Sequence, residues 1–254
     1  MVLRCAGTGS SGNSYALISN IGQILLIECG VNWKKTMRMI DYQISNVIGC
    51  IASHAHLDHL KEYKKVLENW ISIYTNDETA EGFEIATGEL LKGIPEKKWF
   101  QCGEFSIMPF YVPHTTKDKD TGKIIPCPNY GYLVQHEEMG RLLYMTDLEY
   151  CPYNFKNLRV QHLLIECNYI KELADREEEN YRHRLQGHCS LDTCKGIVEA
   201  NKTPDLRTVT LIHLSDKVCD PNRVLKEVKE VAGNRVEVNV AVSGLEVVLN
   251  RFPF

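Results

Sequence analysis

Short apolar runs with strand character alternate along the chain with segments of helical spacing. The first half has five runs rich in β-branched residues, which predict strands at 2–6, 15–19, 23–28, 47–52 and 71–75. Apolar residues three or four positions apart predict helices at 33–40, 59–69 and 77–86, the last with Asp77 as its N-cap. Strands and helices therefore alternate from the start of the chain.

The second half repeats this mixture of strands and helices. Strands are predicted as a pair within 98–112 split at Cys102-Gly103, at 130–134, 142–145, 160–166 and 208–212, and as a pair within 236–250. Helices are predicted at 170–185, 190–200 and 221–231. Two strand-rich halves with interspersed helices favour one sheet packed on another with helices outside. Since no linker rich in Pro, Gly or Ser separates the halves, we expect a single domain over 1–254.

The composition is that of an ordinary globular protein. The 254 residues carry 29 Lys and Arg against 33 Asp and Glu, a net charge of −4, and 44% are hydrophobic. These values argue against disorder and against a strongly cationic nucleic-acid coat. No apolar run approaches membrane-spanning length, and the N-terminus lacks a signal-peptide layout, so we expect a cytoplasmic protein. The ten cysteines form no C-x-x-C pair, which predicts free, mostly buried thiols.

Histidines carry the candidate chemistry. His54, His56, Asp58 and His59 follow directly after the predicted strand 47–52, so that three imidazoles and one carboxylate lie within six residues. Packing these groups together without partners would cost several kcal/mol of desolvation. Nitrogen and oxygen ligands of this kind suit zinc, or manganese and iron where oxygen dominates. The cluster therefore predicts a metal site.

The H-x-H-x-D-H pattern at 54–59 resembles the motif of the metallo-β-lactamase superfamily, and the resemblance extends over nearly the whole chain. It implies a four-layer αβ/βα sandwich with a site for two divalent metal ions at one edge of the sheets, zinc or manganese with iron as a further option. It also implies that one metal is held by His54, His56 and His114 and the other by Asp58, His59 and His213. Asp147 would bridge them, and Glu28 stands where the family has a supporting Asp.

Further motifs resemble the YycJ/WalJ-like branch, whose members are described as nucleases. They are Gly9-Ser-Ser-Gly-Asn13, Thr146-Asp147, Ile165-Glu-Cys-Asn168, Gly187-His-Cys-Ser190 and His213-Leu-Ser215. The chain departs from the branch in a longer Lys/Asp-rich loop at 115–128, in Tyr169 and in Leu191. These changes leave the substrate open.

The resemblance implies a metal-dependent phosphodiester hydrolase, a nuclease acting on DNA or RNA through a hydroxide that bridges the metals. Asp58 and Asp147 would orient the nucleophile, and His188 would protonate the leaving oxygen unless it replaces His213 as the last ligand. The expected substrate contacts are Ser10, Ser11, Asn13, Lys117, Asn168, Arg184 and Ser215. Lys119, Lys123 and Arg182 add positive charge nearby.

Several alternatives stay open at this point. A cyclic-nucleotide or other small-molecule phosphodiesterase and a non-catalytic metal-binding module are the competing functions, and a homodimer is compatible with the sequence. The loop Gly7–Asn13 formally matches a dinucleotide fingerprint, but a hairpin rather than a helix is predicted to follow it. The loop is therefore a tight turn or a phosphate-binding nest. His136 and His162 are expected to be structural and His183 to be solvated.

Overall fold

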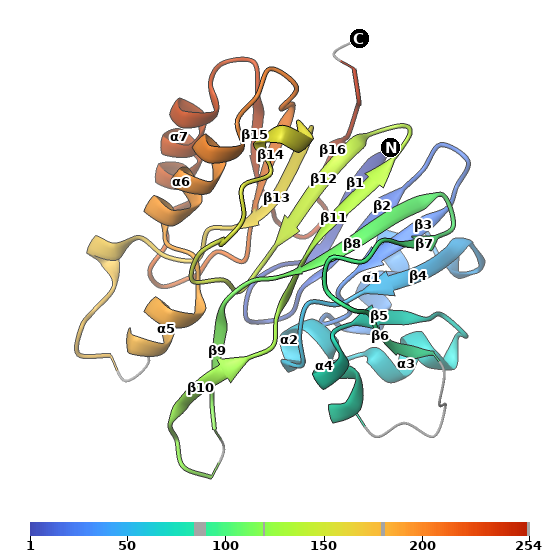
Figure 1. Ribbon diagram of the computed structural model, residues 1–254, viewed down its shortest axis with the longest axis horizontal. Helices are drawn as coiled ribbons and strands as arrows, with labels where there is room; N and C mark the ends of the chain where they lie inside the picture. The colour runs from blue at the N-terminus through green and yellow to red at the C-terminus, as the bar shows by residue number, and fades with distance from the viewer. Residues whose placement is uncertain (84–89, 119, 179–180, 253–254) are drawn as a thin grey trace.

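Two seven-stranded sheets pack face to face in the computed structural model, which describes residues 1–83, 90–118, 120–178 and 181–252 (Figure 1). The first sheet has the order β16-β1-β2-β3-β4-β5-β6. Its strands are β1 (Val2–Gly7), β2 (Ser14–Ile18), β3 (Ile24–Ile27), β4 (Val47–Ile51), β5 (Ile73–Thr75), β6 (Leu91–Gly93) and β16 (Glu246–Val248).

The second sheet has the order β15-β14-β13-β12-β11-β8-β7. Its strands are β7 (Phe100–Cys102), β8 (Phe105–Tyr111), β11 (Tyr130–His136), β12 (Gly140–Met145), β13 (His162–Glu166), β14 (Thr208–Ile212) and β15 (Glu237–Val240). β12 to β15 run parallel, so their carboxyl ends meet at one edge. Ligands of open sheets that contain parallel strands bind at that kind of edge.

Helices cover the outer faces of both sheets. The first sheet carries α1 (Trp33–Met39), α3 (Tyr63–Glu68) and α4 (Asp77–Gly82), and the second carries α6 (Leu191–Asn201) and α7 (Pro221–Ala232) (Figure 1). The remaining helical turns are α2 (Leu57–Leu60), α5 (Tyr181–Gly187), η1 (Ile44–Asn46), η2 (Lys156–Leu158) and η3 (Lys171–Leu173). This arrangement confirms the predicted sandwich. Within the described ranges, no helix is long and apolar enough to cross a membrane.

Alternation along the strands sorts apolar side chains between the layers. Leu25 of β3 packs between the sheets with Tyr132 and Leu164 of the second sheet. The next residue, Leu26, faces outward and packs in the cluster that contains Val66 of α3. Because successive strand residues point to opposite faces, a strand buried on both sides reads as a continuous apolar run. This explains why these runs were readily visible in the sequence.

Three predicted helices differ from the structure. The helix expected at 59–69 is divided into α2 and α3, because the Glu62 N–H leaves the helical ladder and donates to the Cys29 carbonyl at 2.9 Å. The helix expected at 170–185 is η3 followed by α5, because the Asp175 side chain accepts from the Glu177 N–H and forms a local turn. The N-cap of α4 is Asn76 rather than Asp77, and the end expected at 86 lies outside the described residues.

The expected loop at 115–128 is a β-hairpin instead. β9 (His114–Lys117) pairs antiparallel with β10 (Ile124–Cys127) in a separate two-stranded sheet. The hairpin projects beyond the two large sheets and lies beside α5 (Figure 1). It therefore forms a side wall at the edge where the parallel strands end.

Candidate metal centre

The candidate ligands come from the segments that follow four different strands. His54, His56, Asp58 and His59 follow β4, while His114 opens β9 directly after β8. Asp147 follows β12 and His213 follows β14. Their side chains form groups whose ligand atoms lie within 4.8 Å of one another. The structure thus brings together all seven metal-binding residues that the sequence resemblance implies.

Three histidines make up what we term the first ligand cluster, His54, His56 and His114. His56 Nδ1 lies 2.9 Å from His54 Nε2 and 3.3 Å from His114 Nε2. Asp147 Oδ2 lies 3.6 Å from His54 Nε2 and 3.7 Å from His114 Nε2. Four donor atoms therefore converge on one point.

The second ligand cluster consists of Asp58, His59 and His213. Asp58 Oδ2 lies 3.4 Å from His59 Nε2 and 3.3 Å from His213 Nε2. Asp147 again completes the set, with Oδ2 at 3.5 Å from His59 Nε2 and Oδ1 at 3.4 Å from His213 Nε2. Asp147 thus faces both clusters.

These separations fit a metal ion. Ligand bonds of about 2.0–2.1 Å in tetrahedral geometry place neighbouring donor atoms about 3.3 Å apart. Both clusters are close to that spacing, and most of the donor side chains are fully buried. Imidazole with carboxylate is a donor set for zinc, manganese or iron. The His/Asp cluster can therefore bind a divalent metal.

Other side chains hold the ligand imidazoles in place. Behind the first cluster, His54 Nδ1 bonds Ser53 Oγ at 2.9 Å, and His56 Nε2 bonds Thr116 Oγ1 of β9 at 2.9 Å. His114 Nδ1 donates to the carbonyl of Gly187, at the end of α5, at 2.7 Å. Hydrogen bonds of this kind fix the ring orientation and leave the other nitrogen for a metal.

Two buried glutamates stand behind the second cluster. Glu28 Oε1 lies 3.5 Å from His59 Nδ1, and Glu166 Oε1 lies 3.2 Å from His213 Nδ1. Asn168 Nδ2 is 3.1 Å from the same His213 nitrogen. Glu166 Oε1 also accepts a hydrogen bond from His188 Nδ1 at 2.8 Å, and the rings of His188 and His213 stack. Glu166 thus connects a candidate ligand to the candidate proton donor.

Charge is distributed unevenly over the centre. Burial would lower the pKa of His59, but the carboxylates of Asp147 and Glu28 outweigh it and hold that pKa well above its usual range. Burial would also lower the pKa of His213, but the carboxylates of Asp147 and Asp58 outweigh burial and raise this pKa to about 10. In the first cluster burial prevails and lowers the pKa of His114 to about 3. The second cluster therefore attracts positive charge more strongly.

Three residues of the centre have backbones in the left-handed region. The φ angles are 62° at Glu28, 49° at Asp147 and 54° at His213, each just beyond a strand end. A non-glycine residue adopts this backbone conformation at an energetic cost, and residues in such strained conformations are concentrated at functional sites. The reversal of direction after each strand aims these side chains back toward the cluster.

The glycine-rich loop at 7–13 supports the centre rather than a dinucleotide. β2, not a helix, follows it, so the dinucleotide fingerprint is excluded. The Asn13 N–H donates to the Asp58 carbonyl at 2.7 Å, and the Asn13 side chain reaches Asp58 and His59.

Gly30, just after β3, also packs against the ligand loop. A Cβ on Gly30 would lie 1.7 Å from the Asp58 carbonyl oxygen, so only glycine allows the two backbones to lie this close.

A hollow of about 380 Å³ lies beside the clusters. It is lined by Ser10, His56, Thr116, Lys117, Asn168, His183, Arg184, His188 and Ser215. Five of the seven expected substrate contacts are among these residues. Ser11 is exposed on the adjacent turn, and Asn13 is buried behind the ligands. Lys119 lies outside the described residues.

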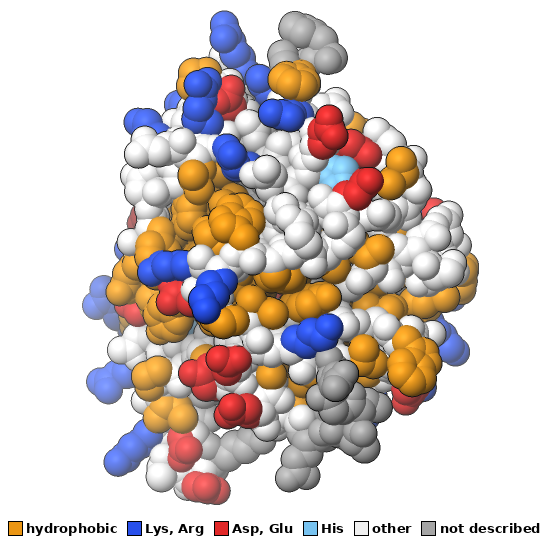
Figure 2. Space-filling model, turned by 45° about the vertical axis from the view of Figure 1, so that its right-hand side comes forward, with side chains coloured by type: hydrophobic (Ala, Val, Ile, Leu, Met, Phe, Trp, Pro, Cys, Tyr) orange, Lys and Arg blue, Asp and Glu red, His pale blue; other side chains and the backbone are white. Residues whose placement is uncertain are grey.

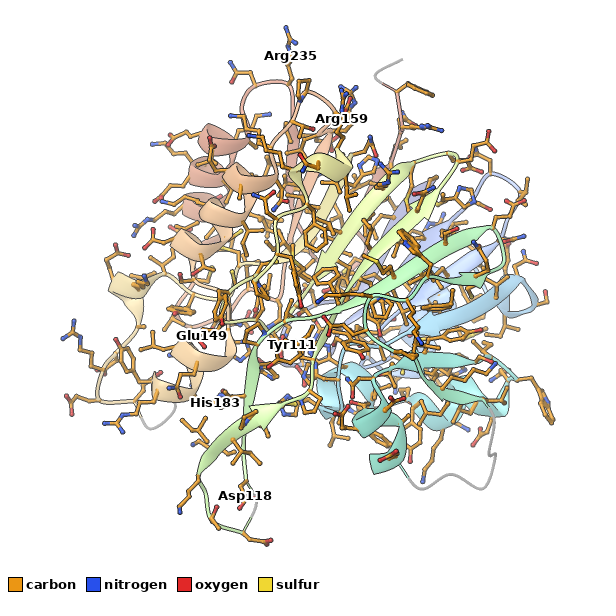
Figure 3. The ribbon with its side chains drawn as sticks, in the orientation of Figure 1. Tyr111, Asp118, Glu149, Arg159, His183 and Arg235 are labelled. Atoms are coloured by element: carbon orange, nitrogen blue, oxygen red, sulfur yellow. The ribbon has the colours of Figure 1, made fainter. Side chains whose placement is uncertain are left out.

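The sequence did not predict a role at the site for His183 or Glu166. His183 was expected in solvent, but it extends from α5 toward β9 and donates to the Thr115 carbonyl at 3.0 Å (Figure 3). A carboxylate at the end of a strand that is otherwise apolar was the available signal for Glu166. His162, by contrast, is a satisfied core residue, with ring nitrogens bonded to Thr208 and Met139.

Fold and site together define a protein of the metallo-β-lactamase type. The chain belongs to the beta-lactamase superfamily, because the family model described as beta-lactamase superfamily domain matches residues 24–214. A comparison with curated protein sequences gave no match. The narrower resemblance to the YycJ/WalJ-like branch stays a prediction.

Solved structures share the fold over almost the whole chain. The metallo-beta-lactamase fold protein YhfI from Bacillus subtilis is 20% identical with a TM-score of 0.72, covering 97% of this chain and 98% of its own. Unliganded yeast PDE1 is 12% identical with a TM-score of 0.70, covering 96% and 98%. The short form of human tRNase Z is 15% identical with a TM-score of 0.63, covering 98% and 99%.

Proposed function

We propose that the protein is a metal-dependent phosphodiester hydrolase, with a nuclease acting on DNA or RNA as the leading form. The observation that carries the proposal is that Asp147 is shared by two complete ligand clusters beside a hollow with basic and imidazole side chains. The names of the neighbours PDE1 and tRNase Z, and the resemblance to a nuclease branch, support phosphodiesters as the substrate class.

Seven residues would hold two divalent cations. These are His54, His56 and His114 for one, Asp58, His59 and His213 for the other, and Asp147 for both. Cations bound there would acidify a water molecule and stabilise negative charge on phosphoryl oxygens. The carboxylates of Asp58 and Asp147 are positioned to orient that water molecule through hydrogen bonds. The buried scaffold of hydrogen bonds keeps all the donors in place before substrate arrives.

His188 is placed to act as the proton donor. Its Nδ1 is occupied by Glu166, which leaves Nε2 as the ring nitrogen available to the hollow. Burial alone would lower the pKa of His188, but the neighbouring carboxylates of Glu166 and Asp147 outweigh burial and raise it, which favours the protonated ring. Transfer of that proton to the departing oxygen would avoid release of an alkoxide.

Lys117 and Arg184 are the candidate phosphate contacts. They line the hollow from β9 and from α5, and Ser10 and Ser215 line it as well. Cations on two walls could neutralise the phosphates next to the scissile bond. Asn13 and Asn168 are assigned positioning roles instead, because their side chains bond the ligand residues.

The proposal is tested by hydrolysis assays with labelled single- and double-stranded DNA, RNA and a panel of cyclic nucleotides, with Mn²⁺ or Zn²⁺. A nuclease that contacts several phosphates should lose affinity steeply as salt rises. Lys117→Ala should weaken polynucleotide binding and reduce the salt slope by about one unit. Absence of cleavage of every polynucleotide at low salt would refute the nuclease form.

A small-molecule phosphodiesterase is the second candidate, favoured by the charge around the hollow. Arg184 is already paired with Glu178 at 2.7 Å, so part of its charge is neutralised. Elsewhere on the molecule, the face shown in Figure 2 carries basic side chains intermixed with acidic and hydrophobic ones. Hydrolysis of cyclic nucleotides with little salt dependence, and none of polynucleotides, would establish this second candidate.

A further inference from the structure

The two ligand clusters differ in the chemistry of the groups that stand behind their histidines. In the second cluster, His59 and His213 each have a carboxylate at their Nδ1, from Glu28 at 3.5 Å and Glu166 at 3.2 Å. Both carboxylates are completely buried. Asp58 adds a third carboxylate as a direct ligand, so negative charge surrounds this cluster.

The first cluster has neutral groups in the same positions, and one of them, the Ser53 hydroxyl, also lies 3.4 Å from His59 Nδ1 of the second cluster. Its three histidines bond the Ser53 hydroxyl, the Thr116 hydroxyl and the Gly187 carbonyl. Among the described contacts, its carboxylate is the shared Asp147, which lies 3.6–3.7 Å away. Three imidazole nitrogens against one oxygen make this cluster the softer donor set.

The backing groups also differ in how firmly they are held. Glu28 accepts from the Ser53 N–H and the Tyr144 hydroxyl, and Glu166 accepts from the N–H groups of Leu148 and Cys189. These donors belong to the core of the sandwich. Of the first cluster's backing groups, Ser53 is likewise fully buried, whereas Thr116 and Gly187 lie on the projecting hairpin and on the short helix α5.

One further atom near the second cluster, a carboxylate oxygen of Glu28, indicates that a positive charge is missing there. Glu28 Oε2 is buried and has no hydrogen-bond partner within the described part of the chain. An unpartnered carboxylate oxygen in the interior is costly unless a cation lies nearby. A cation among Asp58, His59 and His213 would be separated from Glu28 by one imidazole ring.

We propose that the centre binds its two divalent cations unequally, with the first and harder cation going to Asp58, His59 and His213. Carboxylates beside ligating histidines increase their basicity and hold the ring orientation. Oxygen-rich, anionic sites favour hard cations such as Mn²⁺. The cluster of His54, His56 and His114 then takes the second cation. The difference in affinity between the two clusters is larger for Mn²⁺ than for Zn²⁺, because Zn²⁺ also binds well to the imidazole ligands of the first cluster.

The experiment is a titration of metal-free full-length protein with Mn²⁺, in which free Mn²⁺ is measured by electron paramagnetic resonance. We expect two binding classes per chain whose affinities differ at least about 10-fold, the size of effect that backing groups have on metal affinity. The same titration with Zn²⁺, followed by competition with a chromophoric chelator, should give a smaller difference. Two equal classes for Mn²⁺ would overturn the proposal.

Three variants assign the classes to the clusters. Glu28→Gln is the sharpest, because its amide nitrogen would take the place of the unpartnered Oε2. It should weaken the tight class about 10- to 100-fold and leave the weak class unchanged. Thr116→Val removes the hydroxyl behind His56 and should weaken the weak class alone. Glu138→Gln, at a carboxylate paired with the N-terminus far from the clusters, is the matched control and should change neither.

A reversed pattern, in which E28Q weakens the weak class or T116V the tight one, would contradict the proposal. A measurement on the unsubstituted protein keeps it testable if a variant does not fold. In crystals grown with one equivalent of Mn²⁺, the anomalous peak should lie among Asp58, His59 and His213. A peak among His54, His56 and His114 would overturn it, and neither experiment depends on the substrate.

Discussion

The Oε1 atom of Glu166 lies 2.8 Å from Nδ1 of His188, which ties the candidate proton donor to a carboxylate buried at the end of β13. The same oxygen is 3.2 Å from the candidate ligand His213. One carboxylate oxygen therefore contacts both the candidate ligand and the candidate proton donor.

Replacement of His188 by alanine separates a proton donor from a metal ligand. H188A should retain two metals per chain and lose about 10²- to 10⁴-fold in kcat, the contribution typical of a positioned general acid. Elemental analysis and steady-state kinetics measure the two effects. Loss of one metal in H188A would instead identify His188 as a ligand.

Asp147 is the residue on which both clusters depend. D147A should lose metal and turnover together, because one carboxylate supplies a donor atom to each cluster. Elemental analysis after gel filtration gives the metal content. Two metals per chain in D147A would contradict the shared assignment.

Gly30 should be intolerant of any side chain. G30A places a Cβ 1.7 Å from the Asp58 carbonyl oxygen, so the ligand loop must move. We expect the free energy of unfolding to fall by about 1–3 kcal/mol, as for overpacking elsewhere, and metal affinity to fall with it. Urea unfolding and metal titration report the two effects.

Gly196 provides the matched control for that substitution. Gly196 is an exposed residue of α6. Apart from the backbone of its own helix and its chain neighbours, no heavy atom of the described residues lies within 4 Å of the Cβ that an alanine would add here. G196A should therefore stabilise the protein by about 0.5–1 kcal/mol through helix propensity. Equal destabilisation by G30A and G196A would show that the Asp58 contact is unimportant.

His162 should make stability depend on pH. Burial lowers its pKa to about 3, whereas an unfolded histidine titrates near 6.5. Since the unfolded chain binds the extra proton, the contribution is fully present above about pH 6.5 and is lost progressively as the pH falls toward 3. Between pH 7.5 and 5 this amounts to about 2 kcal/mol.

Urea unfolding of the metal-free protein at the two pH values measures this contribution. His162→Gln keeps a donor for the Met139 carbonyl but cannot titrate, so it should show a smaller loss of stability on acidification. An identical loss in H162Q would assign the pH dependence to other groups.

Patterns local in the sequence were sufficient for much of the fold. Doubly buried strands such as β13 read as continuous apolar runs, and the ligands around His54 lie within six residues. The two short helices after His56 were not predictable, because a hydrogen bond from Glu62 to the distant Cys29 carbonyl interrupts the helical ladder.

The supporting residues escaped prediction because tertiary contacts define their roles. Glu166 matters through its proximity to His188 and His213, which are 22 and 47 residues further along the chain. The left-handed backbone at Asp147, just beyond the end of β12, is likewise a property of the folded chain. Neither property has a signature in the local residue pattern.

The hairpin β9–β10 contains both a ligand-bearing base and a separate turn within one short stretch of chain. Its base carries His114 and Thr116, which touch the metal-binding cluster, while Asp118 closes the turn through a backbone bond to Lys123 (Figure 3). Replacements confined to the turn would leave every ligand in place. The hairpin tip is therefore a region in which the chain could acquire a new substrate preference without rebuilding its chemistry.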